Sequence, residues 1–260
     1  MRIVVCMKAV PSTTEVRMDP VTHTIVRDGR QAVVNPFDAS GLEVALEIRE
    51  RLGGHVSALS MGIPDTVRLL RDAISRGADD GLLLSDRAFA GADTLATSYA
   101  LSRAIARGGM PDLVVCGKMA VDGDTAQIGP ELAGALGMSC VTDVREIEHV
   151  DEGHITARRR RDGALELVEA ALPCVITVAK DAATPRMPSI AGVRRGEAGT
   201  VEVLDAEAAG CDPARCGLDG SPTQVVRSFV PERSATAERV EGTSAEQAER
   251  IEQIVEGMAL

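Results

Sequence analysis

Short, continuously apolar runs alternate with longer amphipathic runs along the first two-thirds of the chain. An apolar run without polar alternation is typical of a parallel β-strand that is covered on both faces. The strands predicted in this way are Ile3–Met7, His55–Ser60, Gly81–Leu84, Leu113–Cys116 and Cys174–Val178. Because strands and helical runs follow one another in turn, the pattern predicts an α/β fold with a doubly wound, mostly parallel, Rossmann-like sheet and right-handed crossovers.

Helices are predicted between these strands from their start and stop signals. The first takes Asp38 as its N-cap and ends at Gly53. The second begins at Pro64 and ends at Gly77, and the third spans Ala92–Arg107. Proline at the first helical turn and glycine just past the last turn are common because their backbone preferences suit those positions.

Two segments alternate polar and apolar residues instead and predict antiparallel pairs. Val16–Asp28 alternates around a proline-containing turn and is expected to form an inserted β-hairpin after the first strand. A second antiparallel ribbon is predicted over His154–Glu169. It carries the basic run Arg158–Arg161, which either binds nucleic acid or lies on a solvated hairpin edge. We favour the edge, because basic side chains there prevent unwanted strand pairing and Asp162-Gly163 forms a turn directly afterwards.

The regular pattern ends after about residue 180. Residues 183–199 contain two prolines and three glycines and are predicted to be a loop. The last predicted helix, Ser244–Glu256, carries few apolar residues. We therefore predict an α/β domain over residues 1–220 and an extended C-terminal arm over residues 221–260 that lies on a partner.

Composition and charge exclude several classes of protein. The net charge of −11 argues against nucleic-acid binding, and the 2% of aromatic residues leaves no platform for stacking bases. No apolar stretch reaches the length of a membrane span, and the N-terminus is interpreted as a strand rather than a signal peptide, so we expect a cytoplasmic protein that does not insert into a membrane.

The cysteines and histidines do not form a recognisable reactive or metal site. Cys6, Cys116, Cys140 and Cys174 lie in strand-like runs, and no CxxC pair occurs, so reduced buried thiols are expected. The histidines fall on predicted hairpins or strand starts. No metal site and no catalytic residue is predicted, and whether the protein has enzymatic activity is left open.

The segment from Gly117 to Gly129 carries the candidate chemistry, because ligands of open parallel sheets bind beyond the carboxyl ends of the strands. Gly117 and Gly123 are expected to allow close backbone approach and positive φ angles. Thr125 and Gln127 offer hydrogen-bonding groups. A helix beginning near residues 128–130 would present unpaired N–H groups to a phosphate or diphosphate.

A purely structural interpretation of this loop competes with nucleotide binding. Asp122 and Asp124 are able to cap the helix and shape the turn, and two carboxylates near a phosphate are unfavourable. The loop has neither the GxxxxGK[ST] sequence of a P-loop nor the GxGxxG sequence of dinucleotide-binding folds. The pattern of residues leaves the two interpretations open.

Several motifs resemble the beta subunit of electron-transfer flavoproteins along nearly the whole chain. They read, in order, VVCMKAVP, DPVTHTIVRDG, VVNPFDASGLEVAL, ALSMG, SDRAFAGADTLATS, CGKMAVDGDTAQIGPELA, LPCVITV and SPTQVVRSF. The combination of NPFD with GKxAxDGDTAQ is very specific.

This resemblance implies an adenine nucleotide in the loops above. The implied contacts, carried over by position, are Cys6, Asn35, Pro36, Phe37, Asp38, Met61, Gly117, Lys118, Met119, Ala120, Val121, Asp122, Gly123, Asp124, Thr125, Ala126, Gln127 and Ile128. It also implies an alpha subunit that carries a further FAD and on which the C-terminal arm packs. A loop at 184–193, including Pro185, Arg186, Met187 and the apolar anchor Ile190, would dock an acyl-CoA dehydrogenase.

Two branches of the family differ in the nucleotide of this subunit. Electron-bifurcating members hold FAD, which takes a hydride from NADH and sends electrons to ferredoxin or flavodoxin and to a second acceptor. Conventional members hold structural AMP. DGDTAQIGPE, with small residues at Gly123, Thr125 and Ala126, resembles the bifurcating branch, although Met119 stands where Gln is usual. A stand-alone adenine-nucleotide sensor is the alternative from another class.

Overall fold

The computed structural model describes residues 1–12, 32–226 and 239–258 and divides into two units. Met1–Val225 forms the first, and Val226–Leu260 the second, in which α6 (Ser244–Met258) is the helix predicted at this end of the chain. The hairpin predicted at Val16–Asp28 lies outside the described residues. No helix of the described ranges is long and apolar enough to cross a membrane.

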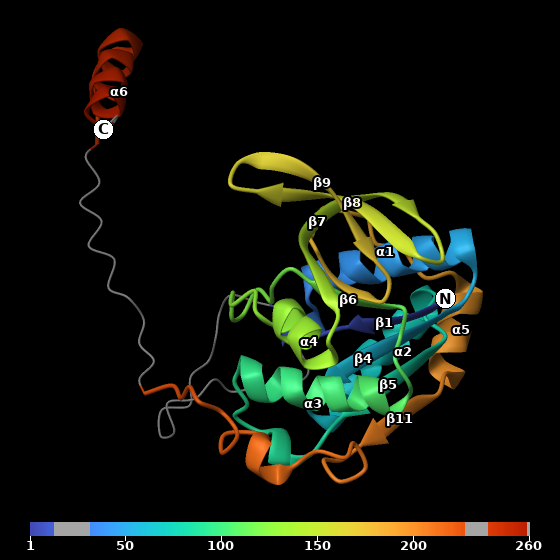
Figure 1. The fold of residues 1–260 in the computed structure, drawn as a ribbon. Helices are drawn as coiled ribbons and strands as arrows, with labels where there is room; N and C mark the ends of the chain where they lie inside the picture. Colours follow the sequence, from blue (N-terminus) through green and yellow to red (C-terminus); the bar gives the residue numbers. More distant parts are fainter. Residues whose placement is uncertain (13–31, 227–238, 259–260) are drawn as a thin grey trace. The chain divides into compact units, whose positions relative to one another are not determined.

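A nine-stranded sheet forms the centre of the first unit, in the order β11-β5-β4-β1-β6-β10-β7-β8-β9 (Figure 1). The strands up to β7 in this order run parallel, and β8 and β9 continue the sheet antiparallel. The strand bounds are β1 Arg2–Cys6, β4 His55–Met61, β5 Asp80–Leu84, β6 Leu113–Gly117, β7 Ser139–Val150, β8 His154–Arg161, β9 Ala164–Ala171, β10 Cys174–Val178 and β11 Val201–Leu204. The predicted doubly wound parallel sheet is confirmed, and so is the ribbon now seen as β8 and β9.

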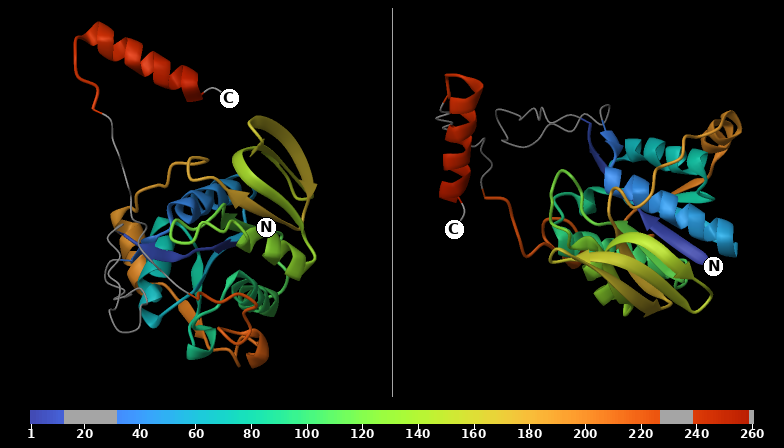
Figure 2. Two further views of the ribbon diagram at one scale, coloured as in Figure 1. Left: turned by 90° about the vertical axis from the view of Figure 1, so that its left-hand side faces the viewer. Right: turned by 90° about the horizontal axis from the view of Figure 1, so that it is seen from above.

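Helices cover both faces of the sheet (Figure 2). They are α1 (Pro36–Leu52), α2 (Val67–Arg76), α3 (Thr94–Arg107) and α4 (Ile128–Leu136). Side chains of β1 alternate between two cores, since Ile3 and Val5 pack with residues of α1 and α2, whereas Val4 and Cys6 pack with residues of α3 and α4. This two-sided burial explains why β1 is apolar at every position from Ile3 to Cys6.

Short elements complete the first unit. β2 (Ala9–Pro11) pairs antiparallel with β3 (Ala32–Val34), and single 3₁₀ turns occur at Pro64–Thr66, Arg87–Phe89 and Pro213–Arg215. The six cysteines are free thiols; Cys6, Cys116 and Cys174 are buried as predicted, whereas Cys140, also predicted to be buried, is only half-buried.

The first helix does not begin as predicted. Asp38 was predicted to be its N-cap, but α1 starts at Pro36 with Asn35 in the capping position, and Asp38 is a buried residue of the first turn. The prediction was wrong because proline at the first helical position already fixes the start of the helix, which leaves the Asp38 carboxylate available for other backbone groups.

A helix, α5 (Ile190–Ala198), occupies part of the segment predicted to be a loop. Its glycines serve packing rather than chain flexibility. A Cβ on Gly192 would lie 2.3 Å from the carbonyl oxygen of Ser75 in α2, and one on Gly196 would lie 2.5 Å from that of Arg71. The two helices therefore approach through backbone contact, a geometry that only glycine permits.

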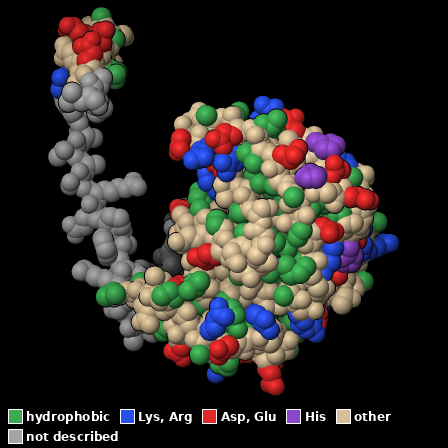
Figure 3. Space-filling view, in the orientation of Figure 1, with side chains coloured by type: hydrophobic (Ala, Val, Ile, Leu, Met, Phe, Trp, Pro, Cys, Tyr) green, Lys and Arg blue, Asp and Glu red, His purple; other side chains and the backbone are tan. Residues whose placement is uncertain are grey.

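The basic run is not on an edge strand, so that prediction was wrong. Arg158–Arg161 belongs to β8, which lies between β7 and β9. Arg158 forms ion pairs with Glu146 and Glu148, and Arg159 pairs with Glu166 across the hairpin. Basic and acidic side chains are interspersed on the face shown in Figure 3 rather than gathered by sign. The predicted turn at Asp162-Gly163 is confirmed, with positive φ at both residues.

Candidate nucleotide-binding site

The loops that follow β1 and β6 leave the sheet side by side at a topological switch point. β1 pairs with both β4 and β6. The chain passes from β1 to β4 through α1 on one face, and from β5 to β6 through α3 on the other. Connections that diverge to opposite faces open a crevice beyond the carboxyl ends of the two strands, which is the usual ligand position in such sheets.

Asn35 fastens the loop after β6 to the start of α1. Its side-chain amide donates to the carbonyl oxygen of Met119 at 2.9 Å and accepts from the backbone N–H of Val121 at 3.3 Å. The residue is 1% exposed, so these protein groups account for its hydrogen bonds. Asn35 therefore shapes the loop rather than presenting its own amide to solvent.

Asp38 joins the two loops through its carboxylate. One oxygen accepts from the backbone N–H of Lys8 at 2.7 Å, and the other accepts from that of Gly117 at 3.1 Å. Burial raises the pKa of this carboxyl to about 7, although hydrogen bonds from Lys8, Asn35 and Gly117 act in the opposite direction. The carboxylate thus fixes the separation of the β1 and β6 loops.

The close approach predicted at Gly117 is present. A Cβ there would lie 2.2 Å from Oδ1 of Asp38 and 2.7 Å from Cβ of Phe37. The positive φ angles predicted for Gly117 and Gly123 are not present at these glycines. They occur instead at Asp124 (φ 50°) and Ala126 (φ 55°). An alanine in the left-handed conformation is strained. Such strain persists only where surrounding contacts hold the backbone in place, which is common at ligand sites.

The second half of this loop lies open to solvent. Residues 121–127 are all exposed, and Lys8 Nζ bonds Asp122 Oδ1 at 2.7 Å. Neither Asp122 nor Asp124 caps α4: the capping position is Gln127, whose side chain makes no capping hydrogen bond. The structural interpretation of the two aspartates as helix caps is therefore wrong, and the first N–H groups of α4 have no side-chain cap.

Three polar residues that the sequence analysis did not single out hold α4 against α3. The Thr94 hydroxyl lies 3.1 Å from Gln127 Oε1 and 3.0 Å from Glu131 Oε1, and the Ser98 hydroxyl donates to Glu131 Oε2 at 2.8 Å. Thr94, Ser98 and Glu131 thus set the position of the helix start. The only signal in the sequence was a glutamate in the first turn after the glycine-rich loop.

Two other predicted nucleotide contacts, Cys6 and Met61, lie at the ends of strands rather than in the loops. Cys6 is buried at the end of β1, in register with Cys116 of β6. Met61 ends β4, on the far side of β1 from β6, and packs in part against the core. Among the described residues, no group of histidine, cysteine, aspartate and glutamate side chains could hold a metal ion.

Comparison with known proteins decides the family. The electron transfer flavoprotein domain matches residues 22–209. The caffeyl-CoA reductase-Etf complex subunit CarD of Acetobacterium woodii is 43% identical over 94% of this chain and 93% of its own length. The electron transfer flavoprotein subunit beta of Thermoanaerobacterium thermosaccharolyticum is 42% identical over 96% of each chain, and the FixA protein of Azorhizobium caulinodans is 44% identical over 92% and 87%. The chain belongs to the electron transfer flavoprotein beta-subunit family.

The segment of this beta subunit predicted to dock a dehydrogenase has two kinds of side chain. Met187 and Ile190 are 84% and 80% exposed, with Ile190 at the first position of α5. Arg186 instead turns inward, where its guanidinium binds Glu43 at 2.8 Å and also pairs with Glu50 of α1. Arg186 therefore anchors the segment, and Pro185 beside it is half-buried.

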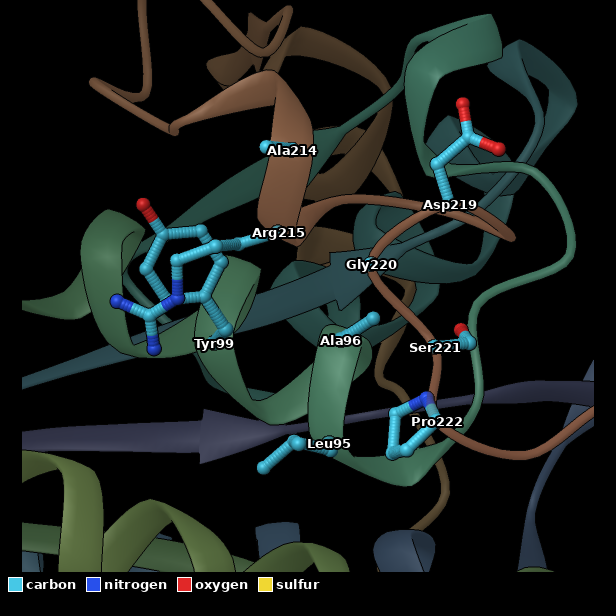
Figure 4. Close-up of a pocket in the computed structure, with 9 residues that line it drawn as sticks. All are labelled: Leu95, Ala96, Tyr99, Ala214, Arg215, Asp219, Gly220, Ser221 and Pro222. Atoms are coloured by element: carbon cyan, nitrogen blue, oxygen red, sulfur yellow. The ribbon is translucent and has the colours of Figure 1, made fainter.

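Two hollows lie elsewhere on the first unit. One, of about 270 Å³, lies between α3 and residues 214–222 (Figure 4). Beside it the Arg215 guanidinium stacks 3.9 Å from the centre of the Tyr99 ring, and the Tyr99 hydroxyl accepts from the Asp212 N–H. The other, of about 450 Å³, lies beside Met187 and α5. The stacking in the first fastens the end of the unit to α3.

Proposed function

We propose that this beta subunit forms a heterodimer with an electron-transfer flavoprotein alpha subunit and holds FAD at the loop between β6 and α4. The single observation that supports this best is the solvent-exposed loop ending at an uncapped helix, held in place by Asn35 and Asp38. Unpaired N–H groups at a helix start favour a phosphate or diphosphate. FAD, when bound, would supply the redox chemistry, and this chain would bind it and tune its potential.

The loop offers room for a group larger than AMP. A Cβ on Gly123 would meet no atom within 4 Å, and Thr125 and Ala126 beside it are small. We therefore favour FAD, with NADH as electron donor, ferredoxin or flavodoxin as one acceptor and an acyl-CoA dehydrogenase-type flavoenzyme as the other partner. The relative named as part of a caffeyl-CoA reductase-Etf complex supports the choice of a partner enzyme that acts on an acyl-CoA. Structural AMP in a conventional carrier is the alternative.

Nucleotide stoichiometry tests the proposal. The chain would be co-expressed with its alpha subunit, the complex purified, and FAD and AMP released with acid and quantified against protein. Two FAD per heterodimer would support bifurcation, whereas one FAD with one AMP would identify a conventional carrier. If no nucleotide beyond the one FAD of the alpha subunit is found, this chain holds none and the assignment of the loop is wrong. A stand-alone sensor would instead form a stable homodimer on size exclusion.

Thr125→Trp is expected to remove nucleotide from this subunit by filling the exposed loop, while the fold persists because Thr125 packs against no core. The matched control is Glu152→Trp, an exposed position in the turn between β7 and β8, where Gly153 bonds Leu172 near the start of β10. The turn therefore lies near the amino end of β10, at the end of the sheet opposite to the candidate site. Nucleotide content per heterodimer is the measurement, and equal content in both variants would contradict the site.

Ile190→Ser is expected to slow electron exchange with the dehydrogenase-type partner about tenfold, because an exposed apolar anchor at the start of a rigidly packed helix contributes burial on docking. Val203→Ser is the control, since Val203 is 52% exposed but lies in edge strand β11. Stopped-flow reduction of the complex by the partner at several partner concentrations is the measurement. A similar loss in both variants would argue against α5 as the docking element.

A further inference from the structure

β7 contains a bulge next to the candidate site. Ile176 of β10 pairs with Val141, and Val178 pairs with Val144, so Thr142 and Asp143 together lie opposite the single residue Thr177. Bulges between parallel strands are rare, and bulges in general occur often beside functional sites. Asp143 adopts φ 53°, a left-handed conformation inside a β-strand. A backbone held in this way requires contacts that maintain it.

One contact from the bulge reaches the first half of the loop. The Asp143 carboxylate bonds Lys118 Nζ at 2.8 Å, and its side chain is 13% exposed. Arg145 lies on the other side of the same carboxylate, 3.5 Å from Oδ1, and is itself held by Asp181 at 2.6 Å. Asp143 therefore fixes the residue that directly follows Gly117.

A second contact reaches the other end of the loop. The backbone N–H of Asp143 donates to the Thr177 hydroxyl at 3.0 Å, and Thr177 is 2% exposed. This hydrogen bond sets the direction of the Thr177 side chain. Its methyl group lies against Gly129 in the first turn of α4, where a Cβ would be 2.2 Å from Thr177 Cγ2.

We propose that Asp143 and Thr177 are positioning residues that clasp both ends of the loop from Gly117 to Ile128. Asp143 holds Lys118 at the beginning of the loop, and Thr177 supports the start of α4 at its end. The bulge allows Asp143 to contact both Lys118 and Thr177. In a regular strand successive side chains lie on opposite faces of the sheet, so the residue after Thr142 would lie on the face opposite to Thr142. Nucleotide affinity then depends on residues that need not touch the nucleotide. This last statement rests on the proposed function, whereas the clasp itself does not.

Amide hydrogen exchange of the loop in the purified heterodimer tests the clasp without reference to any nucleotide. Thr177→Val keeps a methyl group against Gly129 but removes the acceptor for Asp143, and we expect about tenfold faster exchange over residues 118–129. Thr177→Ser keeps the hydroxyl and loses only the methyl group, so we expect exchange over residues 118–127 close to that of the unsubstituted protein and faster exchange only in the first turn of α4. If the valine variant exchanges no faster than the serine variant, the clasp is overturned.

The contact with α4 has its own test. Gly129→Ala is expected to weaken binding of AMP and FAD at least tenfold, because the new methyl group overlaps the Thr177 methyl group. Adding Thr177→Ser removes that overlap and should restore both nucleotide affinity and slow amide exchange. A double variant as impaired as Gly129→Ala alone would contradict the proposed support of α4.

The contact with Lys118 is tested by a double-mutant cycle. Asparagine tolerates positive φ, so Asp143→Asn removes the charge while keeping the backbone of the bulge. If the carboxylate acts through Lys118, Asp143→Asn and Lys118→Gln should each speed exchange of the loop, and the double variant should be no worse than either. Additive effects would overturn this coupling. Unchanged nucleotide content with faster exchange would uphold the clasp and contradict its proposed effect on nucleotide affinity.

Discussion

Gly117→Ala is expected to lower the free energy of unfolding by about 2–3 kcal/mol, as overpacking of a tight site does, and to release nucleotide from the heterodimer. The added methyl group would fall 2.2 Å from the Asp38 carboxylate and 2.7 Å from Phe37 Cβ. Both belong to the first turn of α1, so either α1 or the end of β6 must move. Because Asp38 also holds Lys8, the disturbance reaches both loops of the site.

Gly134→Ala is the matched control for this effect. Gly134 lies inside α4, and a Cβ there would meet no atom within 4 Å. Replacing glycine by alanine in an open helical position is expected to stabilise the helix by up to about 1 kcal/mol. Urea unfolding of both variants, with nucleotide content measured in parallel, separates the two cases. Equal stability of the two variants would show that the close approach at Gly117 is not required.

Asp38 is expected to give the stability of this protein a distinctive dependence on pH. Burial raises its pKa to about 7 in the folded chain, against an ordinary value of 3.8 for this carboxyl group. Between these values the folded chain binds one proton more than the unfolded chain, so protonation favours folding. The stability contributed by this group is fully present only below about pH 4 and is lost as the pH rises to about 7.

Asp38→Asn removes the titrating carboxyl group. The contribution of Asp38 is then the difference in the free energy of unfolding between the two proteins. The free energy of unfolding of the unsubstituted protein, relative to the variant, should fall by up to about 1.4 kcal/mol per pH unit between pH 4 and 7 and then stay level. Urea unfolding at half-unit steps from pH 5 to 8.5 measures this slope, and other titrating groups cancel in the difference. Parallel curves for the two proteins would show that Asp38 keeps an ordinary pKa in the fold.

The positions of most elements could be predicted from local sequence. The apolar strands β1, β4, β5, β6 and β10 lie where predicted, to within one or two residues. So does the loop from β6 to α4, because glycine-rich sequence directly after a buried strand has few other conformations. Strand β11 was missed, since its two central residues are exposed and its pattern is too short to be distinctive.

The sequence alone did not reveal which residues that are far apart along the chain contact each other. Arg186 was expected to face a partner, yet it binds Glu43, which lies 143 positions away along the chain. The glycines of α5 were taken as signs of a loop because the backbone of α2, against which they pack, is not adjacent in sequence. Asp38 was taken as a helix cap for the same reason, since its acceptor role depends on Lys8 and Gly117.

The sequence by itself determined the fold class, the family and the loop that carries the candidate site. Hydrophobic periodicity and local backbone preferences act over a few residues, so they can be recognised in the sequence alone. Only the tertiary structure decided which groups hold that loop. The hydrogen bonds of Asn35 and Asp38 and the bulge that places Asp143 beside Lys118 and Thr177 depend on strand order and register. Those are set by burial of the whole sheet, because a one-residue shift in pairing would move every side chain of a strand to the opposite face.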